Sequence, residues 1–279
     1  EITARHAAGK PEMGVLRESD SSWYMREENG GLLLGPYEVG APCCYVDGPS
    51  SESEFELFQE DIDRLMPYVD TAIARVPAFA EVGVKKVYNG AIAYTPDGSP
   101  MVGPAWGLDN FWLNEGHSFG VTAAGGAGWQ LAEWITEGEP SIDMMGVDPR
   151  RFGPYASRGY LRTKNEEAYA NVFSIHYPDE ERTAARPLKC APCYDRMAAL
   201  GAVFGSVYGW ERPNWFSPPG YALSEADVAQ PDILLNETGA PPDATGKRRE
   251  RWSFRRSNYF NHIGNEVIKL SKPLGAKAK

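Results

Sequence analysis

The chain has 279 residues, 42% of them hydrophobic, and a formal net charge of −10 at pH 7. This length and composition are typical of a soluble globular protein with one or two domains. The negative charge disfavours nonspecific binding to nucleic acid or to an anionic membrane surface. Because no apolar run is long enough to cross a bilayer and residues 1–13 lack the apolar segment of a secretion signal, we expect neither a membrane partner nor secretion.

Two extended runs, Ser21–Arg26 and Leu32–Tyr37, flank Asn29-Gly30 and predict a β-hairpin, because both turn residues tolerate positive φ. Trp23 and Tyr24 then point to opposite faces of the hairpin. One interpretation of Tyr24 is a packed side chain with a hydrogen-bond partner, and the other is a side chain that faces a cavity.

Apolar residues recur at helical spacing between residues 55 and 76, which predicts helical core packing. They are Phe55, Phe58, Ile62, Leu65, Met66, Val69, Ile73 and Val76. Pro67 is expected to kink this helix or to begin a second one. Residues 87–94 and 100–102 read as strands around a turn at 96–98, and they predict a second hairpin.

Phe111–Leu113 predicts a buried strand that shares a sheet with this hairpin and leads through a glycine-bearing turn into an amphipathic helix over residues 121–135. Gly138 and Pro140 are expected to end the helix. The expected inward positions are Val121, Ala124, Gly128, Leu131, Ala132 and Ile135, and the expected outward positions are Gln130, Glu133 and Glu137.

The start of this helix is the first candidate for chemistry. Its free amide groups and dipole favour an anionic or electron-rich ligand, and Gly116 and Gly120 would let that ligand approach the backbone. Gly125, Gly126 and Gly128 would let the helix pack tightly on its sheet, and such packing without any ligand is an equally good interpretation. The spacing is neither Gly-x-Gly-x-x-Gly nor a phosphate loop, so no nucleotide fingerprint is present.

Four cysteines are too few for a disulfide framework in this chain, which indicates a reducing compartment. Cys43 and Cys44 are adjacent, and Cys190 and Cys193 have redox-like spacing, but no second C-x-x-C pair follows. The four histidines are scattered. We therefore interpret the cysteines as structural thiols rather than as a zinc site or a thioredoxin-type centre, and we expect no metal.

The C-terminal half predicts helices over residues 164–173 and 194–204, followed by Trp210 and Trp215 as packing anchors. Residues 218–245 read as a surface excursion, and the tail after Ser271 as mobile. A basic patch consists of Lys247, Arg248, Arg249, Arg251, Arg255 and Arg256. It could contact phosphate, but pairing with the chain's own carboxylates is the preferred interpretation.

Several ordered motifs together resemble the dimethylglycine and sarcosine dehydrogenases, a flavoenzyme family that includes dimethylglycine oxidase. They lie at residues 16–17, 23–26, 30–38, 88–90, 95–100, 116–128, 148–152, 177–182, 209–216 and 253–258. The resemblance implies an α/β fold, which is α+β in this part of the family. Residues 1–145 would be the C-terminal half of a D-amino-acid-oxidase-like FAD oxidoreductase, 146–216 a central linker domain, and 217–279 a loop-rich insertion and the truncated start of an aminomethyltransferase-like folate domain.

The same resemblance implies an FAD enzyme that oxidises an N-methyl amino acid of the dimethylglycine or sarcosine type. The product would be formaldehyde, or methylene-tetrahydrofolate in folate-dependent members. The turn over Gly116, His117, Ser118, Phe119, Gly120, Val121 and Thr122 would bind the flavin ring. Reduced flavin gathers negative charge, which helix-start amides stabilise. Tyr24 would be the catalytic residue on the substrate side.

Two family features are missing from the sequence: the Gly-x-Gly-x-x-Gly fingerprint for the FAD pyrophosphate and most of the folate domain. We therefore expect the nucleotide-binding half in the same polypeptide or in a partner subunit, located in a bacterial cytoplasm or the mitochondrial matrix. The alternative function is a non-catalytic structural or interaction subunit that does not bind FAD alone. A folate-binding module is a weaker alternative.

Overall fold

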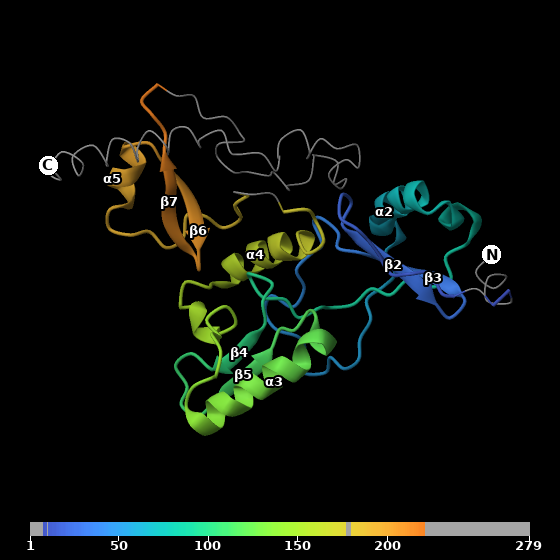
Figure 1. The fold of residues 1–279 in the computed structure, drawn as a ribbon, viewed down its shortest axis with the longest axis horizontal. Helices are drawn as coiled ribbons and strands as arrows, with labels where there is room; N and C mark the ends of the chain where they lie inside the picture. The colour runs from blue at the N-terminus through green and yellow to red at the C-terminus, as the bar shows by residue number, and fades with distance from the viewer. Residues whose placement is uncertain (1–7, 10, 177–179, 221–279) are drawn as a thin grey trace, which may run out of the picture. The chain divides into compact units, whose positions relative to one another are not determined.

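The computed structural model describes residues 8–9, 11–176 and 180–220 (Figure 1). These residues belong to two compact units, which divide between Ile175 and His176. Helices and antiparallel strands are mixed within them, as the predicted fold class requires. The basic patch, the C-terminal tail and nearly all of the expected surface excursion lie outside the described residues. The domain boundary expected near residue 146 stays a prediction.

A three-stranded antiparallel sheet begins the first unit, with β1 (Leu16–Glu18), β2 (Trp23–Glu28) and β3 (Gly31–Pro36) paired in that order. The predicted hairpin is confirmed. Asn29 and Gly30 have φ values of 49° and 75°, the positive values that a tight two-residue turn requires. β1 has no counterpart among the predicted elements, because three residues are too few to show an alternating pattern.

Helix α2 (Ile62–Arg75) packs on this sheet and forms the core of the unit with it. Trp23 and Met25 from β2 meet Tyr68 and Ala72 from α2, and all four are buried. The Trp23 indole nitrogen also donates to the Thr71 hydroxyl at 3.0 Å, so the core tryptophan has its polar group satisfied.

The predicted helix over residues 55–76 differs from the structure at its start. α2 begins only after Asp61, whose carboxylate accepts from the Arg64 amide at 3.1 Å, and Phe55 outside it is 99% exposed. Of the two expectations for Pro67, a second helix beginning there is not found, because α2 continues through Pro67, and a kink stays a prediction. Packing of its inner face on the sheet outweighs the backbone hydrogen bond that proline cannot make.

The second predicted hairpin is wrong. Residues 87–94 form no strand, and Tyr88 and Ile92 are exposed. The segment instead lies beside residues 58–59, where the Phe58 amide donates to the Asn89 carbonyl at 2.7 Å. The predicted turn is confirmed, because the Gly98 amide donates to the Thr95 carbonyl at 3.1 Å.

A second antiparallel sheet consists of β4 (Met101–Pro104) and β5 (Trp112–Glu115), so the predicted strands around residues 101 and 112 do share a sheet. The expected burial of the second strand is not found, because Trp112 is only half-buried. Helix α3 (Gly120–Glu137) contacts both strands (Figure 1). Gly103 allows this contact, since a Cβ there would lie 2.7 Å from the Trp134 ring.

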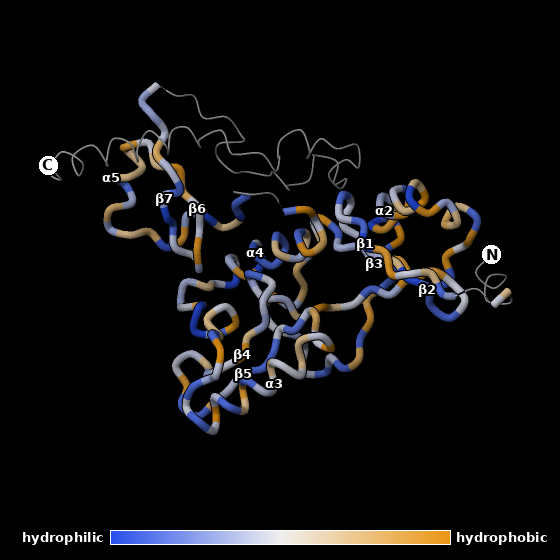
Figure 2. Tube along the Cα trace, viewed as in Figure 1, coloured by the Kyte–Doolittle hydropathy of each residue, from blue (hydrophilic) through white to orange (hydrophobic). Residues whose placement is uncertain are grey.

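The extent of α3 agrees with the prediction, and its C-terminus is capped by Gly138 in the left-handed conformation at φ 88°. The predicted inward face is wrong within the described residues. Val121 is 99% exposed, a Cβ at Gly128 would meet no described atom within 4 Å, and Gln130 is buried. Figure 2 shows hydrophobic and hydrophilic residues mixed along α3. The rest of the described chain therefore packs against only one part of α3, the part that carries Gln130 and Trp134.

The rest of the first unit comprises the short 3-10 helices η1 (Pro77–Glu81) and η2 (Pro149–Arg151) and helix α4 (Arg158–Ala170). α4 begins six residues before the predicted start, because the Ser157 hydroxyl accepts from the Tyr160 amide. It ends before Phe173, which the prediction had included.

The described part of the second unit contains α5 (Tyr194–Ala199), β6 (Ala202–Val207) and β7 (Trp210–Phe216). The helix predicted over residues 194–204 therefore ends early, and its last residues pair as a strand. Gly201 has φ 86° at the change of direction. Trp215 is buried, as an anchor should be, but Trp210 is half exposed. No helix among the described residues is both long and apolar enough to span a bilayer.

Candidate functional site

The glycine-bearing turn after β5 is held against the turn at residues 95–99. Gly116 has φ 71°, and a Cβ there would lie 2.8 Å from the Thr95 methyl group. Thr95 is buried and donates to the Ser99 carbonyl at 2.6 Å. The Arg151 guanidinium, itself buried, donates to both Asp97 oxygens at 2.7 and 2.9 Å. The base of the turn is therefore fixed before any ligand binds.

The first turn of α3 has open donor groups. Phe119 is the N-cap residue and no side chain bonds to the helix start, while the Ala123 amide makes the first helical bond to the Phe119 carbonyl at 3.0 Å. The amides of Gly120, Val121 and Thr122 precede that bond. Because the dipole adds positive potential here, the helix start favours an electron-rich group.

His117 stands in the same turn with one nitrogen engaged and one without a partner. Its Nε2 atom lies 2.7 Å from Asn114 Oδ1, whereas Nδ1 is shielded from solvent and makes no hydrogen bond among the described residues. Ser118 is partly buried, and the side chains of Phe119 and Val121 are exposed beside it. The turn thus combines polar donors with apolar surface.

Tyr24 lies on the face of β2 opposite to Trp23, as predicted, and is half-buried there. It stands across from Gly35 on β3, and its phenol ring occupies the space that a side chain at Gly35 would fill. Glycine at this position therefore lets the tyrosine ring lie flat on the neighbouring strand.

An aromatic cluster surrounds Tyr24. The Tyr24 ring meets the edge of Phe173 at 5.6 Å between centroids, and Phe173 meets Tyr37 at 4.6 Å. Tyr37 then contacts Tyr169 at 5.0 Å, and Tyr169 contacts Tyr94 at 5.7 Å. These separations and tilted planes are those of favourable aromatic pairs, so the cluster fixes the position of the Tyr24 ring.

Charged residues border this cluster on two sides. The Glu38 carboxylate accepts from the Tyr169 hydroxyl at 2.9 Å and also pairs with Arg64. Burial and the charge of Glu38 raise the pKa of Tyr169 well above its ordinary value. Burial and the neighbouring Tyr24 raise the pKa of Tyr37, although Arg17 opposes the shift. Both phenols therefore stay neutral and keep their protons at physiological pH.

Arg17 provides a cation beside Tyr24. The two residues are cross-strand partners of β1 and β2. The guanidinium of Arg17 lies 4.4 Å from the centroid of Phe173 and donates to the Val172 carbonyl at 3.1 Å. Because an arginine has five N–H donors, this arrangement leaves donors for an anionic ligand.

The structure does not place Tyr24 in contact with the glycine-bearing turn. The two are connected through the aromatic cluster, which ends at Tyr94, and then through Thr95, which touches Gly116. Sequence reasoning missed the roles of Arg17 and Phe173, since nothing in the local pattern shows that residue 173 returns to β1. No group of three His, Cys, Asp or Glu side chains that could hold a metal ion occurs among the described residues.

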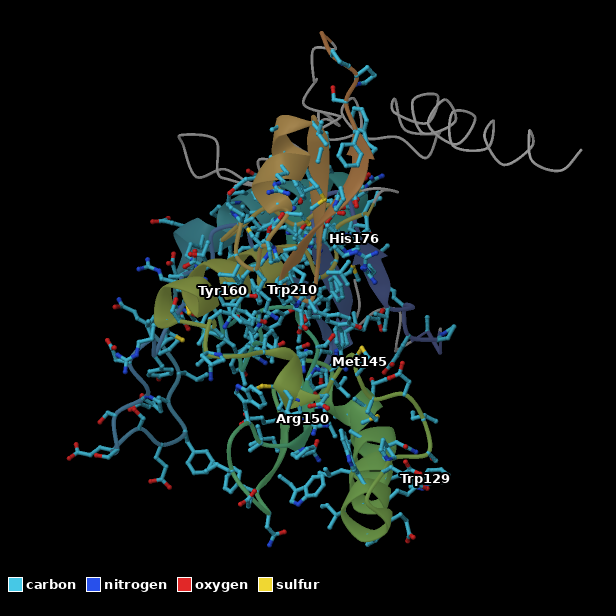
Figure 3. The ribbon with its side chains drawn as sticks, turned by 90° about the vertical axis from the view of Figure 1, so that its left-hand side faces the viewer. Trp129, Met145, Arg150, Tyr160, His176 and Trp210 are labelled. Atoms are coloured by element: carbon cyan, nitrogen blue, oxygen red, sulfur yellow. The ribbon has the colours of Figure 1, made fainter. Side chains whose placement is uncertain are left out.

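A large apolar surface is uncovered near the turn. On and beside α3, the exposed fractions are 67% for Trp129, 58% for Met145 and 52% for Phe111, and Figure 3 labels the first two. A second exposed set includes Phe55, at 99%, and Tyr88, at 71%. Exposed apolar patches of this kind mark surfaces that another chain segment or partner covers.

Comparison with known proteins gives two family models. The model described as "FAD dependent oxidoreductase" matches residues 2–134, and the model described as "FAD dependent oxidoreductase central domain" matches residues 137–191. Human mitochondrial dimethylglycine dehydrogenase is 35% identical over 263 residues, which cover 92% of this chain and 27% of that protein. Human mitochondrial sarcosine dehydrogenase is 34% identical over 224 residues, which cover 79% of this chain and 24% of that protein.

The chain belongs to the dimethylglycine and sarcosine dehydrogenase family of FAD-dependent oxidoreductases. A further relative, 4-methylaminobutanoate oxidase (formaldehyde-forming) of Paenarthrobacter nicotinovorans, is 36% identical over 213 residues, 75% of this chain and 26% of that protein. The chain spans about a quarter of the length of the curated relatives it matches. The resemblance inferred from the motifs is confirmed, and so is the predicted fold class.

Proposed function

We propose that this chain supplies the substrate side and the flavin-ring side of an FAD-dependent oxidoreductase that demethylates an N-methyl amino acid. The observation that carries the proposal is the uncapped start of α3 beside the unpartnered His117 Nδ1, in a chain of this family. The relatives' printed names support a substrate of the dimethylglycine, sarcosine or 4-methylaminobutanoate type.

The described residues fit an isoalloxazine ring at the start of α3. The amides of Gly120, Val121 and Thr122 can donate to its carbonyl edge, and the exposed Phe119 and Val121 side chains offer apolar contact. FAD, when bound, supplies the electron acceptor for oxidation of the N-methyl group. In this proposal the role of the chain is to bind the flavin ring at its electron-rich edge and to place the substrate beside the ring.

Substitution of Gly120 by leucine tests that placement. A Cβ at residue 120 would have His117 Cβ at 3.7 Å as its nearest neighbour, so the chain itself accommodates a side chain there. We expect G120L to fold normally but to bind FAD about tenfold more weakly or worse, because leucine blocks approach to the amides. The measurement is FAD content by absorbance after dialysis of the protein that carries its nucleotide-binding half, with G83L as the control, because a Cβ at the exposed Gly83 would meet no described atom within 4 Å. Equal FAD content in G120L, G83L and wild type would contradict the placement.

Tyr24 is the proposed catalytic residue on the substrate side. Its ring is fixed by Phe173 and by the glycine at position 35, and the phenol can orient the substrate amine through a hydrogen bond. Arg17, its cross-strand partner, is placed to attract the carboxylate that N-methyl amino acids carry.

We propose that the apolar surface around α3 is covered by a nucleotide-binding half, in the same polypeptide or in a partner subunit. Two observations on α3 support this proposal: Trp129 and Val121 are exposed, and the glycines in the middle of the helix contact nothing in the described chain. The relatives are also much longer, since this chain covers only 27% of human dimethylglycine dehydrogenase. A reducing compartment, either a bacterial cytoplasm or the mitochondrial matrix, is consistent with the four free cysteines. Transfer of the carbon unit to tetrahydrofolate is proposed only for a full-length protein with a complete folate domain.

Anaerobic flavin bleaching tests the activity. We expect the protein supplemented with its nucleotide-binding half to lose flavin absorbance when sarcosine, dimethylglycine or 4-methylaminobutanoate is added without oxygen. Glycine serves as the control substrate, because it lacks the N-methyl group. A protein that binds FAD and bleaches with none of these amines would instead support the alternative, a non-catalytic interaction subunit.

A further inference from the structure

The two cysteines of the second unit form a pair that the proposed oxidation does not use. Cys190 and Cys193 are both reduced and exposed, and so is Cys44, whereas Cys43 is partly buried. Because neither thiol of this pair is buried, packing in a core gives the pair no role, and their interpretation as structural thiols stays a prediction. The question is therefore what an exposed C-x-x-C pair does.

Regular structure fixes the chain on both sides of the pair. Before it, the Lys189 amide donates to the Gly209 carbonyl at 3.1 Å, and the Glu211 amide donates to the Lys189 carbonyl at 2.8 Å. After it, Cys193 is the N-cap residue of α5, and the Tyr194 ring packs on Phe204 at 4.3 Å. The two thiols therefore stand at the ends of a short segment whose flanks are both anchored to the β6–β7 hairpin.

The segment between the thiols is already bent. The Tyr194 amide donates to the Ala191 carbonyl at 2.9 Å, which closes a turn over residues 191–194. Cys193 lies inside this turn and Cys190 directly precedes it, and a disulfide requires their Cα atoms to come to about 4.4–6.8 Å. Closing the pair therefore requires a change of backbone conformation within residues 190–193, a segment that lies outside β6 and β7.

The surroundings favour disulfide chemistry over metal binding. No group of three metal-ligating side chains occurs among the described residues, so the two thiolates lack the further ligands that a zinc site uses. Desolvation, followed by the charges of Glu211 and Asp195, raises the pKa of the Cys190 thiol. A raised pKa lowers the thiolate fraction at neutral pH, so attack by Cys190 on a disulfide should be faster at higher pH.

We propose that Cys190 and Cys193 form a thiol–disulfide exchange site that reacts with low-molecular-weight disulfides such as oxidised glutathione. One cysteine thiolate attacks the glutathione disulfide, forms a mixed disulfide and releases one glutathione thiolate. The second cysteine thiolate then attacks the protein sulfur of that mixed disulfide and releases the second glutathione. The two protein sulfurs lose two electrons in total, one glutathione disulfide becomes two thiols, and the two cysteine protons pass to the released thiolates.

Trypsin provides a direct test, because it separates the two cysteine pairs of the chain. Cleavage after Lys189 and Arg196 yields a peptide that contains Cys190 and Cys193, whereas Cys43 and Cys44 lie together in the peptide Glu27–Arg64. The full chain is equilibrated in a series of glutathione buffers, alkylated with iodoacetamide, digested and analysed by mass spectrometry. We expect the peptide Cys190–Arg196 to appear unalkylated and about 2 Da lighter in oxidising buffer, and fully alkylated after dithiothreitol.

The adjacent pair Cys43–Cys44, of which only Cys43 is partly buried, is the control, and we expect its peptide to stay alkylated where the first peptide is oxidised. In C193S the exchange stops halfway, so Cys190 should retain one glutathione. C44S should leave the link between Cys190 and Cys193 unchanged. The proposal is overturned if both cysteines of Cys190–Arg196 remain alkylated, or each carries its own glutathione, in strongly oxidising buffer. Neither outcome depends on FAD, so it is independent of the proposed oxidation.

Discussion

Replacement of Tyr24 by phenylalanine is expected to slow flavin reduction by about 10²-fold while FAD content stays unchanged. The ring of the new residue keeps its contacts with Phe173 and Gly35, so only the hydroxyl that orients the substrate is lost. The measurement is the anaerobic reduction rate in a stopped-flow instrument, at saturating N-methyl amino acid, in the protein that carries its nucleotide-binding half.

Tyr160 is a suitable control for this substitution. It pairs with Tyr155 at 5.5 Å outside the cluster around Tyr24, and burial raises its pKa to about 12, so it is a neutral phenol at physiological pH. Y160F should leave the reduction rate unchanged. Equal rates in wild type and Y24F would remove Tyr24 from the catalytic site, whereas loss of FAD in Y24F would make its role structural.

Replacement of Trp23 by alanine is expected to destabilise the first unit by about 3–5 kcal/mol. The indole is fully buried between β2 and α2, and its removal leaves a cavity against Met25, Tyr68 and Ala72. It also leaves the Thr71 hydroxyl without its donor. The free energy of unfolding is measured on this chain by urea titration, with circular dichroism and tryptophan fluorescence compared to establish a single transition.

W129A provides the same chemical change on the surface. Trp129 is 67% exposed on α3, so its loss should change the free energy of unfolding by no more than about 0.5 kcal/mol. If both variants lost similar stability, the core would not be centred on Trp23. If W129A instead lowered the affinity of this chain for a separately expressed nucleotide-binding half, that loss would support the proposed cover over α3.

Local sequence signals predicted the elements that depend on a few neighbouring residues. Asn29-Gly30 specified a tight hairpin, and Gly138 specified the end of α3, because positive φ is a property of the residue itself. The prediction that Trp23 and Tyr24 point to opposite faces followed from the alternation of side chains along a β-strand. The motifs that indicated the family were also local, and the comparisons confirm the family.

Sequence patterns failed where burial depends on distant parts of the chain. Val121 and Phe55 have the apolar character of inward residues, but each is 99% exposed in the described structure. Gln130 is polar and yet buried, because it bonds to Ser141 after the chain turns back. Periodicity shows which residues share a face of a helix, but it does not show what lies against that face.

The candidate site was predicted only in part for the same reason. The sequence by itself determined the family and the glycine-bearing turn that opens α3, because each is carried by contiguous residues, whereas the catalytic role of Tyr24 stays a prediction. Only the tertiary structure decided that Phe173 and Arg17 fix Tyr24, that His117 Nδ1 has no partner, and that the C-x-x-C thiols are exposed. Contacts and exposure depend on residues far apart in the chain, and the energies involved arise from packing and desolvation. A local sequence pattern contains neither.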